Sequence, residues 1–163
     1  MSPEAQQVIV QLGLAPLPVE GGFFRRLWTS TAKLPSGREA ASSIYFLLTA
    51  DDFSALHRMM VSEEIWHFHA GDAVDHAQFD PQQARVFLTK LGGNVLAGEF
   101  PQLLVRSGVW QGARLAPGGR HGWALIGCTV SPAWDPADFE LGDRTALSAA
   151  FPENAALVRE LTR

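Results

Sequence analysis

Apolar and polar residues alternate with a period of two through the middle of the chain, the spacing that places successive side chains on opposite faces of a β-strand. Turn-forming residues such as Gly92-Gly93 and Pro117-Gly118-Gly119 interrupt this alternation about every 8 to 12 residues. The pattern predicts strands over residues 23–30, 41–52, 53–61, 60–71, 75–80, 84–92, 103–105, 109–116 and 123–130. Short strands at this spacing indicate a single antiparallel sandwich or barrel.

Residues at both ends of the chain follow a helical pattern instead. Ser2 can cap a short helix that Gly13 ends. Asp143 can cap a helix through residues 144–151, and a second helix follows over residues 153–161. Helices at the ends and strands in the middle predict a mainly β architecture. We expect the terminal helices to lie across an open edge or mouth of the barrel, where they would cover unpaired strand groups.

Composition and charge narrow the class of protein. A chain of 163 residues, 47% of them hydrophobic, suits one domain over residues 1–163. A net charge of -4, with the 13 basic residues scattered, offers no stripe for a nucleic-acid backbone. The sequence shows neither a signal-peptide pattern nor an apolar run of membrane-spanning length. We therefore expect a cytoplasmic protein without a nucleic-acid or membrane partner.

Candidate chemistry gathers in one stretch, residues 56–72 (LHRMMVSEEIWHFHAGD). It begins with His57 and contains a strand pattern in which Glu64, Trp66 and Phe68 share one face. A carboxylate and an imidazole beside aromatic walls are typical of a small-molecule site. If the protein catalyses a reaction, we expect residues of this stretch to carry it out.

The other histidines and the single cysteine have simpler interpretations. His67 and His69 lie on the strand face opposite Glu64, which favours a dimer interface or the outer surface of the sheet over a metal site. His76 and His121 stand in turn-like contexts, so we expect both to be exposed. Cys128 has no partner for an intramolecular disulfide and is expected to be a small buried residue.

The spacing of the central stretch resembles the first motif of the cupin superfamily: His, any residue, His, four residues, Glu, six residues, Gly. His57, Glu64 and Gly71 match, whereas Met59 stands where the second histidine would be. The second cupin motif, Pro, any residue, Gly, two residues, His, has its best counterpart at residues 106–111, with Gln111 at the histidine position.

The resemblance extends over most of the chain and points to one family. It is carried in family order by residues 16–30, 42–48, 55–72, 100–113 and 127–144. Together these segments resemble the cupin-5 family (DUF985), whose members are often labelled predicted sugar epimerases. The resemblance implies an RmlC-like jelly-roll cupin barrel, an antiparallel double-stranded β-helix, with short terminal helices and a pocket inside. It also implies a homodimer.

If the barrel is right, later strands add polar and aromatic groups to the pocket. We expect Trp110 or Gln111 there, and Gln102 if it does not merely satisfy backbone groups at a strand entry. His57 and Glu64, on neighbouring strands, can form a hydrogen-bonded pair. That pair could be a base and its orienting group, half of a metal site, or a structural pair without chemistry.

The sequence does not decide which face of two other strands points inward. Tyr45 can serve as an acid for epimerisation if it shares the pocket with His57, but not if Phe46 faces inward instead. Arg25 and Arg26 face opposite sides of their strand, so either one points inward or both reach solvent.

The sequence leaves three functions open. The favoured one is a metal-independent sugar epimerase or isomerase, without cofactor, that acts on a small polar organic molecule. The second is a non-catalytic small-ligand-binding protein. The third is a metal-dependent cupin dioxygenase or isomerase using His57, Glu64 and Gln111 with waters, or recruiting His67 or His69 through strand bulges. We expect no metal, because Met59 and Gln111 are weak ligands for divalent ions.

Overall fold

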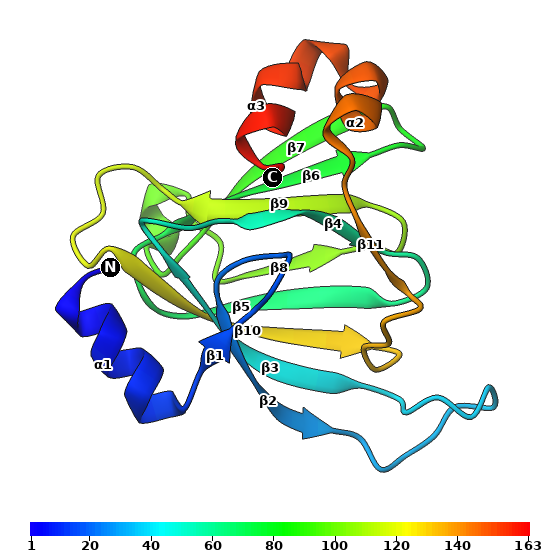
Figure 1. Cartoon of the computed structure of the whole chain (residues 1–163), viewed down its shortest axis with the longest axis horizontal. Coiled ribbons are helices and arrows are strands. Elements are labelled where there is room, and N and C mark those ends of the chain that lie inside the picture. Colours follow the sequence, from blue (N-terminus) through cyan, green and yellow to red (C-terminus); the bar gives the residue numbers. More distant parts are fainter.

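The computed structural model describes residues 1–163 as two antiparallel β-sheets that face each other (Figure 1). One sheet has six strands in the order β1 (Ala15–Pro16), β2 (Phe23–Thr29), β3 (Ser42–Thr49), β10 (Trp123–Ser131), β5 (Glu63–Gly71) and β8 (Gln102–Val105). The other has five strands in the order β11 (Phe139–Leu141), β4 (Ser54–Met59), β9 (Trp110–Leu115), β6 (Val74–Asp80) and β7 (Arg85–Leu91). The predicted mainly β jelly-roll architecture is confirmed.

The helices are short and lie near the two ends of the chain. They are α1 (Pro3–Leu12), α2 (Arg144–Ala150) and α3 (Ala155–Glu160). Single 3-10 turns occur at η1 (Val95–Ala97), between β7 and β8, and at η2 (Pro152–Asn154), between α2 and α3. Ser2 caps α1 by accepting from the Ala5 amide, and Asp143 caps α2 by accepting from the Ala146 amide, as predicted. No helix of the protein combines the length and the hydropathy needed to cross a membrane.

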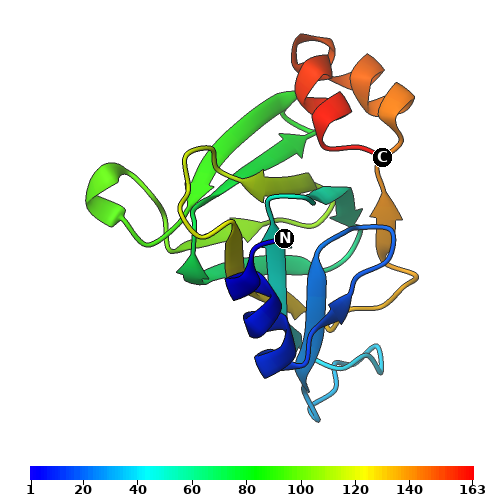
Figure 2. The same cartoon turned by 60° about the vertical axis from the view of Figure 1, so that its left-hand side comes forward.

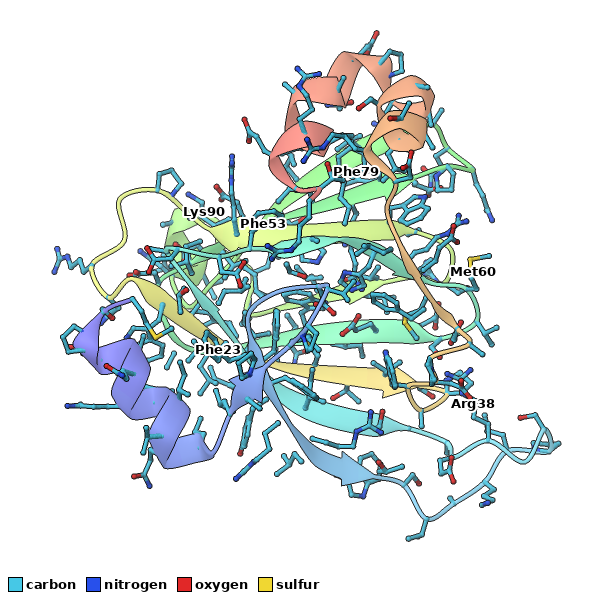
Figure 3. The ribbon with its side chains drawn as sticks, in the orientation of Figure 1. Phe23, Arg38, Phe53, Met60, Phe79 and Lys90 are labelled. Atoms are coloured by element: carbon cyan, nitrogen blue, oxygen red, sulfur yellow. The ribbon has the colours of Figure 1, made fainter.

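Two hydrophobic cores hold the layers together. The larger lies between the sheets and includes Phe46, Trp66 and Ile126. The smaller lies on the outer side of the five-stranded sheet, where Phe79 packs against Phe151 with ring centroids 5.2 Å apart. The C-terminal helices cover this outer face (Figures 1 and 3). The expectation that they would lie across an open edge or the mouth of the barrel was therefore wrong, because they pack on the face of a sheet. Figure 2 shows α1 on a separate side of the barrel.

One buried carboxylate joins three loops at the edge of the barrel. Asp138 is 4% exposed and accepts hydrogen bonds from the Val61 amide (2.5 Å), the Ser62 amide (3.1 Å) and the Ser62 hydroxyl (2.6 Å). Arg38 adds an ion pair at 2.9 Å. Because Asp138 accepts hydrogen bonds from these two amides, β5 begins at Glu63. The sequence pattern predicted a strand that begins at Met60. These contacts of Asp138 with Val61, Ser62 and Arg38 form the Asp138 clamp. The clamp also positions β11, a strand that the sequence pattern did not predict.

Candidate functional site

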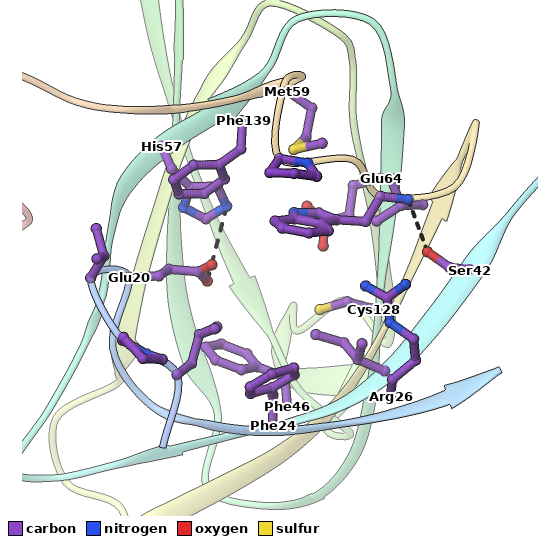
Figure 4. Close-up of a pocket in the computed structure, with 17 residues that line it drawn as sticks. Glu20, Phe24, Arg26, Ser42, Phe46, His57, Met59, Glu64, Cys128 and Phe139 are labelled. Atoms are coloured by element: carbon purple, nitrogen blue, oxygen red, sulfur yellow. Dashed lines mark hydrogen bonds and ion pairs between the residues drawn. The ribbon is translucent and has the colours of Figure 1, made fainter. Parts of the chain in front are cut away.

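A cavity of about 560 Å³ lies between the two sheets (Figure 4). Its wall is mainly apolar, with Phe24 and Phe46 from the six-stranded sheet and Phe139 from the five-stranded sheet. A few ionisable or hydrogen-bonding side chains interrupt this wall: Glu20, Arg26, Ser42, His57, Glu64 and Cys128. An apolar cavity of this size with a few polar groups is typical of a small-molecule site.

His57 projects into the cavity from β4 and is 4% exposed. Its Nδ1 lies 2.8 Å from the carbonyl oxygen of Ala55. Because a carbonyl only accepts hydrogen bonds, Nδ1 carries the proton, and Nε2 of the neutral ring keeps its lone pair. The ring stacks on Phe139 at 5.4 Å between centroids. His57 therefore presents a fixed basic nitrogen to the cavity.

Glu20 is the carboxylate nearest to that nitrogen, and sequence reasoning missed it. Its Oε1 lies 4.0 Å from His57 Nε2 and accepts from the Ser54 hydroxyl at 2.9 Å. Its backbone oxygen accepts from the Ala55 amide. Gly21 follows with φ 102°, and a side chain there would meet the Phe53 carbonyl. A glutamate followed by two glycines in a loop is the signal that could have identified it.

Glu64 also lines the cavity, but it does not bond to His57. The predicted hydrogen-bonded pair was wrong, because β4 and β5 belong to different sheets and the two side chains approach from opposite walls. Glu64 instead accepts from Gln111 Nε2 at 2.5 Å. Burial raises the pKa of Glu64, only partly offset by the nearby His57. The carboxyl group thus holds its proton to a higher pH than an exposed glutamate.

Gln111 is held in one orientation by groups below the cavity. The indole Nε1 of Trp66 donates to Gln111 Oε1 at 2.9 Å. Because an indole nitrogen only donates, the amide oxygen must face Trp66 and the amide nitrogen must face Glu64. Gln111 thus lies inside the barrel, as expected. Trp66 is buried in the core beneath the cavity rather than in its lining.

Comparison with known proteins identifies the family. Residues 6–142 match the family described as Cupin superfamily (DUF985). The chain belongs to this DUF985 cupin family. No curated protein matches the sequence.

Solved structures agree with the family assignment. A crystal structure of a protein from Shewanella oneidensis is 37% identical, with a TM-score of 0.88 over 98% of this chain and 97% of that one. A hypothetical protein from Leishmania major is 32% identical, with a TM-score of 0.88 over 97% and 98% of the two chains. A dTDP sugar isomerase from Desulfovibrio desulfuricans is 14% identical, with a TM-score of 0.58 over 88% and 87%. The last comparison shows a shared fold only.

The residues of this cupin at the usual metal-ligand positions do not fit a divalent metal. Gln111 directs its amide oxygen to Trp66 and its amide nitrogen, a donor, to Glu64. Met59 lines the cavity with a thioether, a poor ligand for hard or borderline ions. Glu20 and Cys128 line the cavity together with His57 and Glu64, but no group of three or more His, Cys, Asp or Glu side chains is arranged to hold a metal ion.

His76 was expected to be exposed, and this prediction was wrong. It is 1% exposed on β6, and its ring meets that of Trp66 edge-on at 4.8 Å between centroids. Its Nε2 lies 3.3 Å from Gln111 Oε1, and its Nδ1 has no partner. Burial lowers the pKa of His76 to about 3. The strand alternation places this histidine inward, and a neutral ring completes the hydrogen bonding of Gln111.

The stability of this cupin should therefore fall with pH below neutrality. As the pH drops below the ordinary histidine pKa of about 6.5, the side chain of His76 binds a proton in the unfolded chain. In the folded protein the same side chain stays neutral until about pH 3. His76 alone then costs up to about 1.4 kcal/mol of unfolding free energy per pH unit. Urea unfolding of the wild type and His76→Phe from pH 7 to pH 4 measures this. The variant should gain relative to the wild type as the pH falls, whereas a constant difference would contradict the assignment.

Tyr45 lies outside the cavity. Ile44 and Phe46 on either side of it line the cavity, so Tyr45 points to the outer face of the six-stranded sheet. There the Arg25 guanidinium lies 5.6 Å from the Tyr45 ring centroid, and His69 meets the ring edge-on. The open question is answered: Phe46 faces inward, so Tyr45 is not the acid partner of His57.

Three other predicted site residues also lie elsewhere. Gln102 is exposed, and its Nε2 lies 2.8 Å from His67 Nδ1 on the outer face of the six-stranded sheet. Trp110 belongs to the smaller core, with the Arg58 guanidinium 4.2 Å from its ring centroid. Phe68 packs against the larger core without lining the cavity.

The remaining histidines and Cys128 lie where the sequence placed them. His67 and His69 share the outer face of the six-stranded sheet, and burial together with the neighbouring His69 lowers the pKa of His67. His121 is exposed and bonds to Glu4. Cys128 is buried at the cavity wall, where burial raises the pKa of its thiol well above the usual value.

Proposed function

We propose that this cupin binds a small polar organic molecule in the cavity and moves a proton at a carbon beside a carbonyl group, as in a sugar epimerase or isomerase. The observation that carries the proposal is the tautomer of His57. Its Nδ1 proton is held by Ala55, so its Nε2 lone pair faces the cavity. A positioned base of this kind is what abstraction of a carbon-bound proton requires.

The opposite walls supply the two proton carriers that epimerisation needs. His57 Nε2 takes the proton, and the electrons of the broken C–H bond move into the carbonyl to give an enolate. Glu20, 4.0 Å away, stabilises the resulting imidazolium. Glu64 approaches from the other sheet with a raised pKa and can return a proton to the opposite face of the same carbon. Exchange with solvent then restores both groups.

We propose that this reaction needs no metal. The support is the donor set, because the amide oxygen of Gln111 is engaged and Met59 replaces a histidine. Elemental analysis of protein purified without chelator or affinity tag tests this. Less than about a tenth of a transition-metal ion per chain is expected, since tight binding needs about four ligands. One metal per chain, lost together with ligand binding in His57→Ala, would replace the proposal with a metal-dependent mechanism.

A thermal-shift screen followed by isotope exchange tests the function itself. Nucleotide sugars, keto-sugars and small acids form the screen, because a ligand specific to the folded state raises the melting temperature. Each compound that binds is then incubated with the protein in heavy water. We expect a carbon-bound proton beside the carbonyl to exchange for deuterium. A ligand returned without exchange would support the second candidate, a non-catalytic binding protein, which the apolar wall of the cavity also suits.

We also propose that two chains form a homodimer. The support is the family resemblance together with exposed apolar side chains on the outer face of the six-stranded sheet, among them Ile65 and Leu104. Light scattering at micromolar concentration should give about twice the chain mass of 17.7 kDa. A mass equal to one chain would refute the dimer.

A further inference from the structure

Arg26 is the one arginine that lines the cavity. It lies on β2 opposite Ile44 of β3, and both side chains face inward, whereas its neighbour Arg25 lies opposite Tyr45 and faces outward. Figure 4 shows the Arg26 side chain pointing into the cavity across from His57 and Glu20. Arg26 thus brings a permanent positive charge to one end of an apolar space.

The Arg26 guanidinium has no carboxylate partner in the protein. Arg38, Arg58 and Arg163 each form an ion pair with an aspartate or glutamate, but Arg26 forms none. Its guanidinium carbon lies 5.7 Å from the ring centroid of Trp134. Arg26 is solvent-exposed and lines the cavity near its mouth. An arginine there without a carboxylate partner is suited to a carboxylate or phosphate group of a ligand.

Ser42 supplies a second donor beside Arg26. It is 2% exposed, lines the cavity from β3, and faces the same side of the sheet as Ile44. Its oxygen accepts from the Trp134 amide at 3.0 Å (Figure 4). Because a hydroxyl that accepts one hydrogen bond still has its own proton to give, Ser42 can donate to a ligand in the cavity. The two donors come from adjacent strands.

We infer, on the basis of the proposed function, that the natural ligand carries an anionic group that Arg26 and Ser42 bind. Its apolar or carbon-rich part then lies against Phe24 and Phe46, and its reacting carbon lies at the His57 end. The carboxylate of Glu20 at that end disfavours the reverse orientation, because it would repel the anion. The substrate class is therefore a small carboxylate or phosphate ester of a carbonyl compound, rather than a neutral sugar.

Calorimetric titration with matched fragments tests the anionic subsite without requiring catalysis. The probes are benzoate, its neutral analogue benzamide, and phenyl phosphate, which separates a carboxylate preference from a phosphate preference. We expect one of the two anions to bind at least about tenfold more tightly than benzamide, the effect of one charge-assisted contact near a cavity mouth. Arg26→Met should remove this preference. Arg25→Met is the control, since it removes the adjacent charge on the outer face and should leave the preference intact.

The outcomes separate this inference from the proposed reaction. His57→Gln should keep the preference for the anion even though it lacks the base, because His57 lies at the other end of the cavity. The inference is overturned if benzamide binds as tightly as both anions, if Arg26→Met keeps the preference, or if neither anion binds the wild type. An intact anion preference without any proton exchange in heavy water would leave the subsite standing and refute only the reaction.

Discussion

Replacing His57 by glutamine should lower the rate of carbon-bound proton exchange by about 10²- to 10⁴-fold, the usual contribution of a positioned general base. Glutamine has a similar size and can still donate to the Ala55 carbonyl, but it cannot accept a proton from carbon. The measurement is the initial rate of deuterium incorporation, by proton NMR, into a ligand found in the thermal-shift screen.

His121→Gln is the matched control for this experiment. The His121 side chain is exposed, bonds to Glu4 and is not part of the cavity lining, so its replacement should leave the exchange rate unchanged. Glu20→Gln should give a smaller loss than His57→Gln, because it removes only the charge that stabilises the imidazolium. Exchange that continues at the wild-type rate in His57→Gln would show that another group is the base.

Replacing Asp138 by alanine should lower the free energy of unfolding by about 3 kcal/mol, the cost of removing one partner of a buried ion pair. The change leaves the Arg38 guanidinium without its carboxylate and removes the acceptor of the Val61 and Ser62 amides. The loop that carries Trp134 to the cavity would lose its anchor as well. Chemical denaturation followed by tryptophan fluorescence measures the loss.

Asp135→Ala is the control from the same loop. Asp135 is half-buried, and its carboxylate accepts only from the Ala137 amide, so removing the carboxylate should cost less than about 1 kcal/mol. Equal losses in the two variants would mean that any change in this loop destabilises the protein to the same degree. The Asp138 clamp would then have no special role.

Strand periodicity predicted much of the barrel because one face of each strand is buried. It placed Glu64 and Trp66 inward and His67 and His69 outward, as the structure has them. It could not decide between Tyr45 and its neighbour, since both are aromatic and either can pack inward. Alternation thus identifies the faces of a strand, and the choice of the inner face depends on tertiary packing.

The sequence pattern could not predict which strands belong to the same sheet or how they pair. His57 and Glu64 are seven residues apart and were expected on neighbouring strands, but the chain crosses from one sheet to the other between them. Glu20 enters the site from a loop, where no periodicity exists. Gln102 was expected inside, although the register that pairs it with His67 turns it outward. Such positions depend on long-range pairing, which a single sequence does not record.

Nitrogen NMR of the His57 ring tests the central claim, that Nε2 is a free base facing the cavity. In ¹⁵N-labelled protein, His57→Gln identifies the signals by their loss. In the neutral ring we predict a proton on Nδ1, none on Nε2, and a change in the Nε2 signal when a ligand enters the cavity. A proton on Nε2 with the lone pair on Nδ1, or an Nε2 signal unaffected by a bound ligand, would contradict the account.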